Sequence, residues 1–298
     1  MPSPILVPLD GSAFAELALP LAARIAAAHD AVLHLVRAVD IAGGADHPRR
    51  HEAQDYLTRA AATAASSCGC QVTTALASEG DSPAEAILAE AGRIGAGLLV
   101  LTTHGRGGFS RLWLGSVATA LLAAARVPVL VVREPDEGAP PMVPAEPRHL
   151  LVPVDGSPAS DAALTTAVAL GAPFAARCTL LHVVKTGDSL LPYDQTFWTP
   201  AEQAAVEAQR AAAEDRMMRT VERLRGEGVA AEGIVVLAPD PARVILQTAA
   251  EQGADLLALG AVARAGGRLH RVGLGGVTDK VLRAATVPVL VVHAPEHA

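Results

Sequence analysis

The chain of 298 residues is poor in several residue types, and each shortage excludes a class of protein. Its three cysteines are an odd number without a C-x-x-C pair, so we expect thiols rather than a disulfide framework, and no metal site. No uninterrupted apolar run reaches the roughly 20 residues of a membrane-spanning helix, although 51% of the residues are hydrophobic. We therefore expect a soluble protein without a membrane partner.

Basic charge is scarce as well. The formal net charge is −7, and nucleic-acid binding requires a basic face, so no nucleic-acid partner is expected. The first residues, "MPSPILVPLDGS", contain neither a basic region nor a small-residue cleavage site, and they run directly into a strand-like pattern. No secretory signal is visible, and we expect a cytoplasmic protein.

The chain contains a long internal repeat. "PILVPLDGSAFAELAL" at 4–19 aligns with "HLLVPVDGSPASDAAL" at 149–164, and "VPVLVV" at 127–132 recurs at 287–292. Repeat units of solenoid proteins are about 20 to 50 residues long, so a repeat of this length indicates duplicated domains instead.

A proline-rich segment separates the two copies. "REPDEGAPPMVPAEPRH" holds five prolines and few apolar residues, which is typical of a linker. We predict a first domain at 1–135, a linker at 136–147 and a second domain at 148–298.

Short β-branched or leucine-rich runs alternate with alanine-rich helical stretches in both halves. The strands predicted in the first half are 5–9, 32–39, 71–78, 97–102 and 129–133. Apolar strands separated by helices indicate a parallel sheet covered on both faces. Ser157-Pro158 predicts a helix start, and Thr199 with Glu202 forms a capping-box pattern before a helix that ends near 225. The predicted fold class is α/β, with two doubly wound parallel-sheet domains of Rossmann-like (HUP) type in tandem.

Three loops in each half follow the carboxyl ends of strands, where doubly wound sheets bind ligands. In the first half these loops follow Asp10, Ala38 and Leu101, and the third is rich in glycine. Gly115-Ser116 then opens a helix whose positive N-terminal end favours phosphate. A Walker A motif is absent, and no G-x-G-x-x-G follows the first strand. Spacing alone leaves a phosphate cradle and a plain glycine-rich turn equally open.

Both halves resemble the universal stress protein family over nearly their whole length. The resemblance rests on V-P-[LV]-D-G-S, G-D-x-P-A-x-x-I, T-H-G-R-G-G, L-G-S and the closing V-P-V-L-V-V. Members of this family that bind ATP share the motif G-x2-G-x9-G-[ST]. The first half departs from this motif only at Thr102, which stands in place of the first glycine. The second half keeps Gly260, replaces the second glycine by Ala263 and lengthens the gap from nine residues to eleven.

The resemblance also implies which residues contact a nucleotide. In the first half these are Pro8, Asp10, Ala38, Thr102, His104, Gly105, Gly115, Ser116 and Val117. The corresponding, degenerate set of the second half is Pro153, Asp155, Val183, Gly260, Gly275, Gly276 and Val277. We interpret His104 as a ligand contact, because no nucleophile or carboxylate lies near it in the sequence at a spacing typical of a catalytic pair. No catalytic residue is assigned.

The predicted function is a stress-response regulator that binds ATP, AMP or ADP mainly in the first half, with Mg²⁺ accompanying ATP. At most weak ATP hydrolysis is expected. The alternative is a scaffold without nucleotide, acting through dimerisation and partner binding. An adenylate-forming enzyme would need S-G-G-x-D-S or H-x-G-H, and neither occurs. The resemblance further implies that 127–132 and 287–292 pair within the chain, which leaves other surfaces for a homodimer.

Overall fold

The computed structural model describes most of the chain. The described residues are 3–39, 48–78, 82–103, 114–133, 146–186, 199–261 and 275–294.

Each half contains five strands with helices between them. The first half consists of β1 (Ile5–Pro8), α1 (Ala13–Glu16), α2 (Leu19–Ala28), β2 (Leu33–Ala38), α3 (Pro48–Cys68), β3 (Val72–Ala77), α4 (Pro83–Ile94), β4 (Leu98–Thr102), α5 (Ser116–Ala124) and β5 (Val129–Val132). The second half consists of β6 (His149–Pro153), α6 (Pro158–Gly171), a 3₁₀ turn (Ala172–Phe174), β7 (Arg177–Lys185), α7 (Pro200–Gly226), β8 (Ala231–Ala238), α8 (Pro241–Gln252), β9 (Leu256–Ala261), α9 (Gly276–Ala284) and β10 (Val289–His293). All five strands predicted for the first half are confirmed to within one residue at each end.

Local capping interactions explain where several helices begin. The Ser157 hydroxyl accepts a hydrogen bond from the backbone N–H of Ser160 at the start of α6. Both bonds of the capping box between Thr199 and Glu202 are present at the start of α7. Each bond satisfies a backbone donor that the first helical turn leaves unpaired, so these helix starts follow from sequence patterns of a few residues.

The helix after the first strand differs between the halves. In the first half it is broken into α1 and α2, whereas α6 is continuous. Pro20 lies at the break, and proline inside a helix lacks the N–H donor and clashes with the preceding turn. The repeat places Thr165 at the equivalent position of α6, where the helix continues. A single proline therefore changes how this helix covers the sheet.

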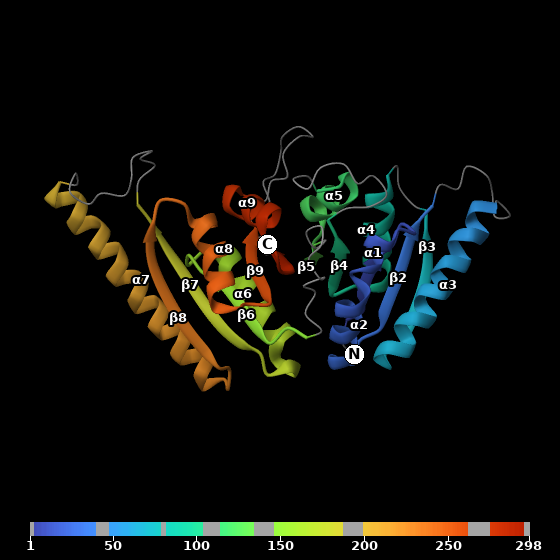
Figure 1. Ribbon diagram of the computed structural model, residues 1–298, viewed down its shortest axis with the longest axis horizontal. Coiled ribbons are helices and arrows are strands. Elements are labelled where there is room, and N and C mark those ends of the chain that lie inside the picture. The colour runs from blue at the N-terminus through green and yellow to red at the C-terminus, as the bar shows by residue number, and fades with distance from the viewer. Residues whose placement is uncertain are drawn as a thin grey trace.

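The ten strands form one sheet in the order β3-β2-β1-β4-β5-β10-β9-β6-β7-β8. Within each half all paired strands are parallel, and the halves join where β5 pairs with β10 in antiparallel orientation (Figure 1). Leu130 faces Leu290 at the centre of this pairing, so the two halves are related by an internal pseudo-two-fold axis. The predicted pairing of 127–132 with 287–292 within the chain is thus observed.

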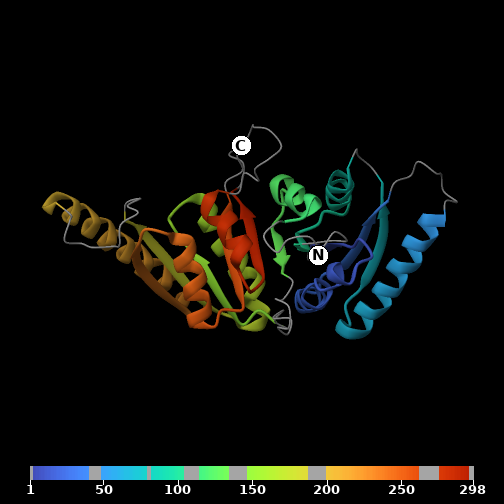
Figure 2. The ribbon, with the colours of Figure 1, turned by 45° about the horizontal axis from the view of Figure 1, so that its top comes forward.

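Helices cover both faces of the sheet, and a hydrophobic core lies under each set. One core lies beneath α2, α3, α6 and α7, and the other beneath α4, α5, α8 and α9. Alternate residues of β5 and β10 enter both cores, so each core continues across the junction of the halves. The helices α3 and α7 lie at opposite ends of the molecule in both ribbon views (Figures 1 and 2).

Two expectations drawn from composition can be compared with the structure. No helix within the described ranges combines the length and the apolar character needed to cross a membrane. The expectation of thiols is wrong for Cys70, which is disulfide-bonded, whereas Cys178 is free and buried. Burial disfavours the thiolate and raises the pKa of Cys178 to about 12, so this thiol is inert at neutral pH.

A buried polar cluster attaches α4 to the sheet. Glu90 accepts hydrogen bonds from Arg93 at 2.7 and 2.6 Å and lies 2.7 Å from Nε2 of His34. The other ring nitrogen of His34 contacts the Thr73 hydroxyl on β3. The hydrogen bonds from Arg93, opposed by burial and assisted by His34, lower the pKa of Glu90. The folded state therefore favours the ionised carboxylate.

The substitution Glu90→Gln should destabilise the protein at neutral pH. Loss of hydrogen bonds to a buried charged group should lower the free energy of unfolding by about 1.5 to 3 kcal/mol. A folded pKa below the unfolded value of about 4.3 stabilises the protein above that pH, and this contribution is lost as the pH falls through the folded pKa. Urea unfolding should therefore show a difference from wild type that shrinks below about pH 4. Glu222→Gln on the exposed face of α7 is the control, and a pH-independent difference would contradict the assignment.

Candidate functional site

Three strands of the first half, each followed by a predicted binding loop, end at one edge of the sheet. The strand β1 lies between β2 and β4, and all three are parallel, so their carboxyl ends share an edge. Pro8 ends β1, Ala38 ends β2 and Thr102 ends β4. The strand order reverses between β1 and β4, which is where doubly wound sheets open a crevice for ligands. The structure therefore brings these predicted residues together.

The N-terminus of α5 is anchored at the same edge. The backbone N–H of Gly115 donates to the Thr103 carbonyl over 2.8 Å, which joins the start of α5 to the end of β4. Ser116 is exposed, and Val117 is partly buried against the core. Free N–H groups of the first helical turn carry a partial positive charge, which favours an anion beside them. The carbonyl of Thr103, a residue that the sequence did not single out, therefore positions the N-terminus of α5.

The glycine at 115 is not required by the backbone. Its φ of −57° and ψ of 154° are accessible to other residues. A Cβ atom added there would meet the Thr103 carbonyl oxygen at 3.5 Å, an ordinary contact. Neither the backbone conformation nor the packing of the described residues therefore requires glycine at 115. Two predicted contacts of this loop, His104 and Gly105, lie outside the described residues.

The Asp-Gly-Ser sequence after β1 has a local structural role. Asp10 accepts hydrogen bonds from the Ser12 backbone N–H at 2.9 Å and from its hydroxyl at 2.6 Å. The Ser12 hydroxyl in turn accepts from Ala15 and caps α1. Gly11 has a φ of +89°, a left-handed conformation that glycine adopts without strain. These bonds fix the direction of the Asp10 carboxylate, and the D-G-S pattern could have identified this turn.

The second half repeats the turn after its first strand. Asp155 accepts from the Ser157 backbone N–H at 2.9 Å. Burial opposes ionisation of Asp155, but the hydrogen bonds with Ser157 and Ser160 together outweigh it, so the pKa of Asp155 is lowered. Pro153 ends β6 as Pro8 ends β1, and Val183 on β7 packs against the same core as Ala38.

Gly260 on β9 contacts a helix rather than open space. A Cβ atom added to Gly260 would lie 2.4 Å from the carbonyl carbon of Ala159 and 2.7 Å from the amide nitrogen of Ser160. The start of α6 therefore packs directly on this glycine. The equivalent residue of β4 is Thr102, whose side chain fits because α1 packs less closely on β4 than α6 packs on β9. Helix packing alone accounts for this glycine of the motif.

The helix starts of α5 and α9 also differ. Gly275 precedes α9 with a φ of +87°, whereas Gly115 precedes α5 with a φ of −57°. Gly276 stands where α5 has Ser116, so the hydroxyl donor is missing. Val277 is 37% exposed, while its counterpart Val117 is partly buried. The backbone N–H groups at the N-termini of α5 and α9 therefore have different surroundings.

Comparison with known proteins gives consistent matches. A model of the universal stress protein family matches residues 1–133 and 146–293. A universal stress protein of Mycolicibacterium smegmatis is 30% identical over 306 residues, covering 97% of this chain and 96% of that protein. Another from Mycobacterium tuberculosis is 34% identical over 199 residues, covering 66% of this chain and 61% of that protein. The match thus spans less than two thirds of the latter relative.

A solved structure supports the fold. The crystal structure of a universal stress protein from Archaeoglobus fulgidus covers 98% of this chain and 96% of its own, with a TM-score of 0.71 and 18% sequence identity. Together with the strand order, this likeness confirms the predicted fold class of tandem doubly wound α/β units.

Proposed function

Since the chain belongs to the universal stress protein family, with the family model matching both of its halves, we propose that it is a cytoplasmic stress-response regulator that binds an adenine nucleotide. The nucleotide binds to the first of two domains, residues 1–135 and 148–298. ATP is the proposed ligand, with AMP or ADP as alternatives. Its adenine lies beside Pro8, Asp10 and Ala38, and its phosphates lie beside Thr102, Gly115, Ser116 and Val117.

The hydrogen bond between Gly115 and Thr103 carries this proposal. It holds the N-terminus of α5 beside the carboxyl ends of β1 and β4, where the strand order reverses. Backbone donors at a helix N-terminus bind phosphate well, because the N–H groups point at the anion and the helix dipole favours negative charge. The missing side chain at Gly115 leaves the backbone accessible to a phosphate group.

The second domain is proposed to bind nucleotide weakly or not at all. The backbone of α6 packs against Gly260 and takes up the space beside it. The start of α9 also differs from that of α5 in backbone conformation, and it has Gly276 where α5 has a serine. The proposed stoichiometry is therefore one nucleotide per chain.

The proposed role is regulatory rather than enzymatic. Among the described residues of the site we assign no nucleophile and no general base, so hydrolysis is expected to be slow or absent. Within the same part of the chain, no three His, Cys, Asp or Glu residues form a group that could hold a metal ion. Mg²⁺ accompanying ATP would thus be carried mainly by the phosphates. Homodimerisation would use surfaces other than β5 and β10, because these strands pair with each other.

A scaffold without nucleotide is the competing function. The local role of Asp10 in the turn before α1 favours it, because that role accounts for the aspartate without a ligand. The two functions differ in whether nucleotide binding is measurable.

Nucleotide content and binding decide between these functions. The full chain is purified and denatured, the supernatant is analysed for adenine nucleotides, and the nucleotide-free protein is titrated with ATP by calorimetry. We expect one ATP per chain. Absence of both released nucleotide and binding heat at millimolar ATP would rule out the nucleotide function, and two equivalent sites would contradict the asymmetry between the halves.

A further inference from the structure

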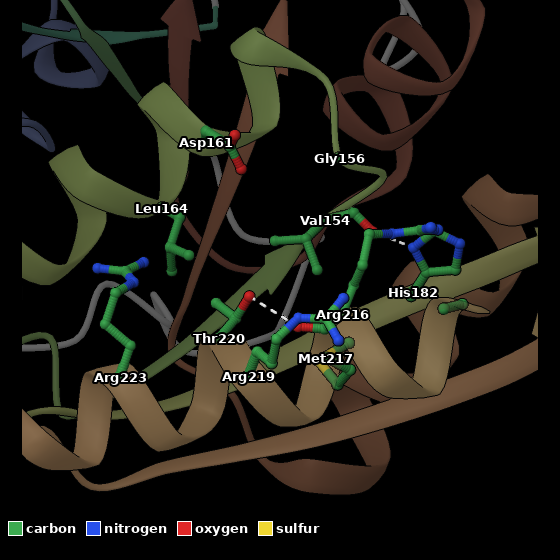
Figure 3. A pocket seen from close by; sticks show the side chains of 11 residues that line it. Val154, Gly156, Asp161, Leu164, His182, Arg216, Met217, Arg219, Thr220 and Arg223 are labelled. Atoms are coloured by element: carbon green, nitrogen blue, oxygen red, sulfur yellow. Dashed lines mark hydrogen bonds between the residues drawn. The ribbon is translucent and has the colours of Figure 1, made fainter. Parts of the chain in front are cut away.

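A cavity of about 370 Å³ lies in the second half between α6 and α7, above β7 (Figure 3). We call it the α6–α7 cavity. Its apolar lining, including Leu164 and Met217, belongs to the core beneath α6 and α7. Val183, the predicted nucleotide contact on β7, packs against the core on the opposite face of the sheet. The cavity therefore opens on the other face of the sheet from Val183, although Val154 and Gly156 of its lining flank Asp155 in the chain.

Positive charge dominates the lining of the α6–α7 cavity. Arg216, Arg219 and Arg223 extend from one side of α7, and Asp161 on α6 is the acidic residue of the lining (Figure 3). Arg223 pairs with Glu227 on its own helix at 3.0 Å. Within the described ranges, neither Arg216 nor Arg219 forms an ion pair. A concave surface lined by one sign of charge concentrates ions of the opposite sign.

The base of the α6–α7 cavity is apolar and buried. The side chains of Leu164, Ala213 and Met217 are buried there. His182 is held on β7 because its Nδ1 donates to the Val154 carbonyl over 2.6 Å. A carbonyl oxygen only accepts hydrogen bonds, so Nδ1 carries a proton. Such an arrangement suits a ligand with an apolar body and an anionic end.

The equivalent position in the first half carries different side chains. The repeat places Arg37 where β7 has His182 and Glu16 where α6 has Asp161. The buried residues Leu57 and Ala64 of α3 recur as Met217 and Leu224 of α7, which places Tyr56 where α7 has Arg216.

Tyr56 packs against the core of the first half at this position. The Arg37 guanidinium lies over its ring, 5.3 Å from the centroid, and the ring packs against the core. Burial, followed by the nearby carboxylate of Glu16, raises the pKa of Tyr56, so the phenol stays neutral. In the second half a flexible arginine replaces this ring and a histidine replaces the stacked arginine. The duplicated position thus holds an arginine stacked on a tyrosine in one half and lines a cationic cavity in the other.

We propose that the α6–α7 cavity binds a small organic phosphate monoester. The guanidinium groups of Arg216 and Arg219 hold the phosphate, and the organic part lies against Leu164 and Met217. Guanidinium matches a phosphate group in geometry and charge through paired N–H···O bonds. Two arginines without an ion pair suit a dianion better than the single charge of a carboxylate. A volume of about 370 Å³ is at the small end of the range for ligand sites and is sufficient for a small monoester.

Phenyl phosphate is the probe that tests this site. It is titrated by calorimetry into the full chain and into the double variant Arg216→Met with Arg219→Met, which keeps the apolar stems of both exposed side chains. We expect binding by wild type and at least a tenfold loss of affinity in the double variant. Arg210→Met is the matched control, because Arg210 lies on the same helix, pairs with Glu214 at 2.8 Å and is outside the cavity lining. It should bind like wild type.

Amide NMR of the wild-type chain locates the probe without any substitution. Saturation with phenyl phosphate should shift the amide signals of Ala213 and Thr220, which line the cavity. The proposal is overturned if wild type does not bind at millimolar phenyl phosphate, or if the double variant binds equally well. Shifts confined to Ser116 and Val117 would also overturn it, because the probe would then occupy the start of α5.

Discussion

The variant Gly115→Val should fold like wild type and lose most of its affinity for ATP. The backbone conformation of Gly115 is accessible to valine, and the nearest neighbour of an added Cβ is the Thr103 carbonyl oxygen at 3.5 Å. The branched side chain would instead occupy the space in which a phosphate approaches the N-terminus of α5. Loss of hydrogen bonds to a charged group costs about 1.5 to 3 kcal/mol, which corresponds to a roughly 10- to 100-fold loss of affinity.

Calorimetric titration with ATP, alongside thermal unfolding, measures this effect. Gly276→Val at the start of α9 is the control, because it introduces the same side chain at the second helix start and an added Cβ there meets nothing within 4 Å. Its ATP affinity should equal that of wild type. Unchanged affinity in Gly115→Val would remove the start of α5 from the nucleotide site, and equal losses in both variants would show that both halves bind ATP.

Gly260→Ala should produce a large loss of stability without any ligand present. The added Cβ would lie within 2.7 Å of three backbone atoms of Ala159 and Ser160, and these atoms cannot turn away as a flexible side chain can. Either α6 moves off β9 or β9 distorts. Overpacking of this kind costs about 1 to 3 kcal/mol, and backbone clashes place this variant near 3 kcal/mol.

Denaturant unfolding of the full chain tests this expectation. Gly92→Ala is the control, because Gly92 lies in α4 with nothing within 4 Å of an added Cβ. Alanine is the better helix former, so this change should raise stability by up to about 1 kcal/mol. If Gly260→Ala were as stable as wild type, α6 would have room to shift, and the glycine of β9 would need an explanation other than packing.

The two glycines show how far one motif can be interpreted from sequence. Both match glycine positions of the motif that the resemblance associates with ATP, so the sequence alone predicts a nucleotide contact at each. The structure separates them, since Gly115 borders accessible space whereas Gly260 touches the backbone of another helix. The environment of Gly260 depends on how closely α6 packs on β9. In the first half Pro20 breaks the equivalent helix, and α1 packs less closely on β4.

The α6–α7 cavity marks a limit of sequence analysis. Arg216 and Arg219 lie in a helix with many charged residues, and no local pattern in the sequence distinguishes them from its other arginines. His182 is far from them along the chain. Comparing the two halves position by position, Tyr56 against Arg216 and Arg37 against His182, was the signal that could have identified the cavity.

The sequence by itself determined the strands, the helix starts at Ser157 and Thr199, the duplication and the family. These features depend on apolar periodicity and on hydrogen bonds between residues a few positions apart, which are visible in the sequence. Only the tertiary structure decided which glycine faces open space, how Leu130 and Leu290 centre a continuous ten-stranded sheet, and where a cationic cavity opens. Those features depend on distances between elements that are remote in sequence, and packing of the whole fold sets those distances.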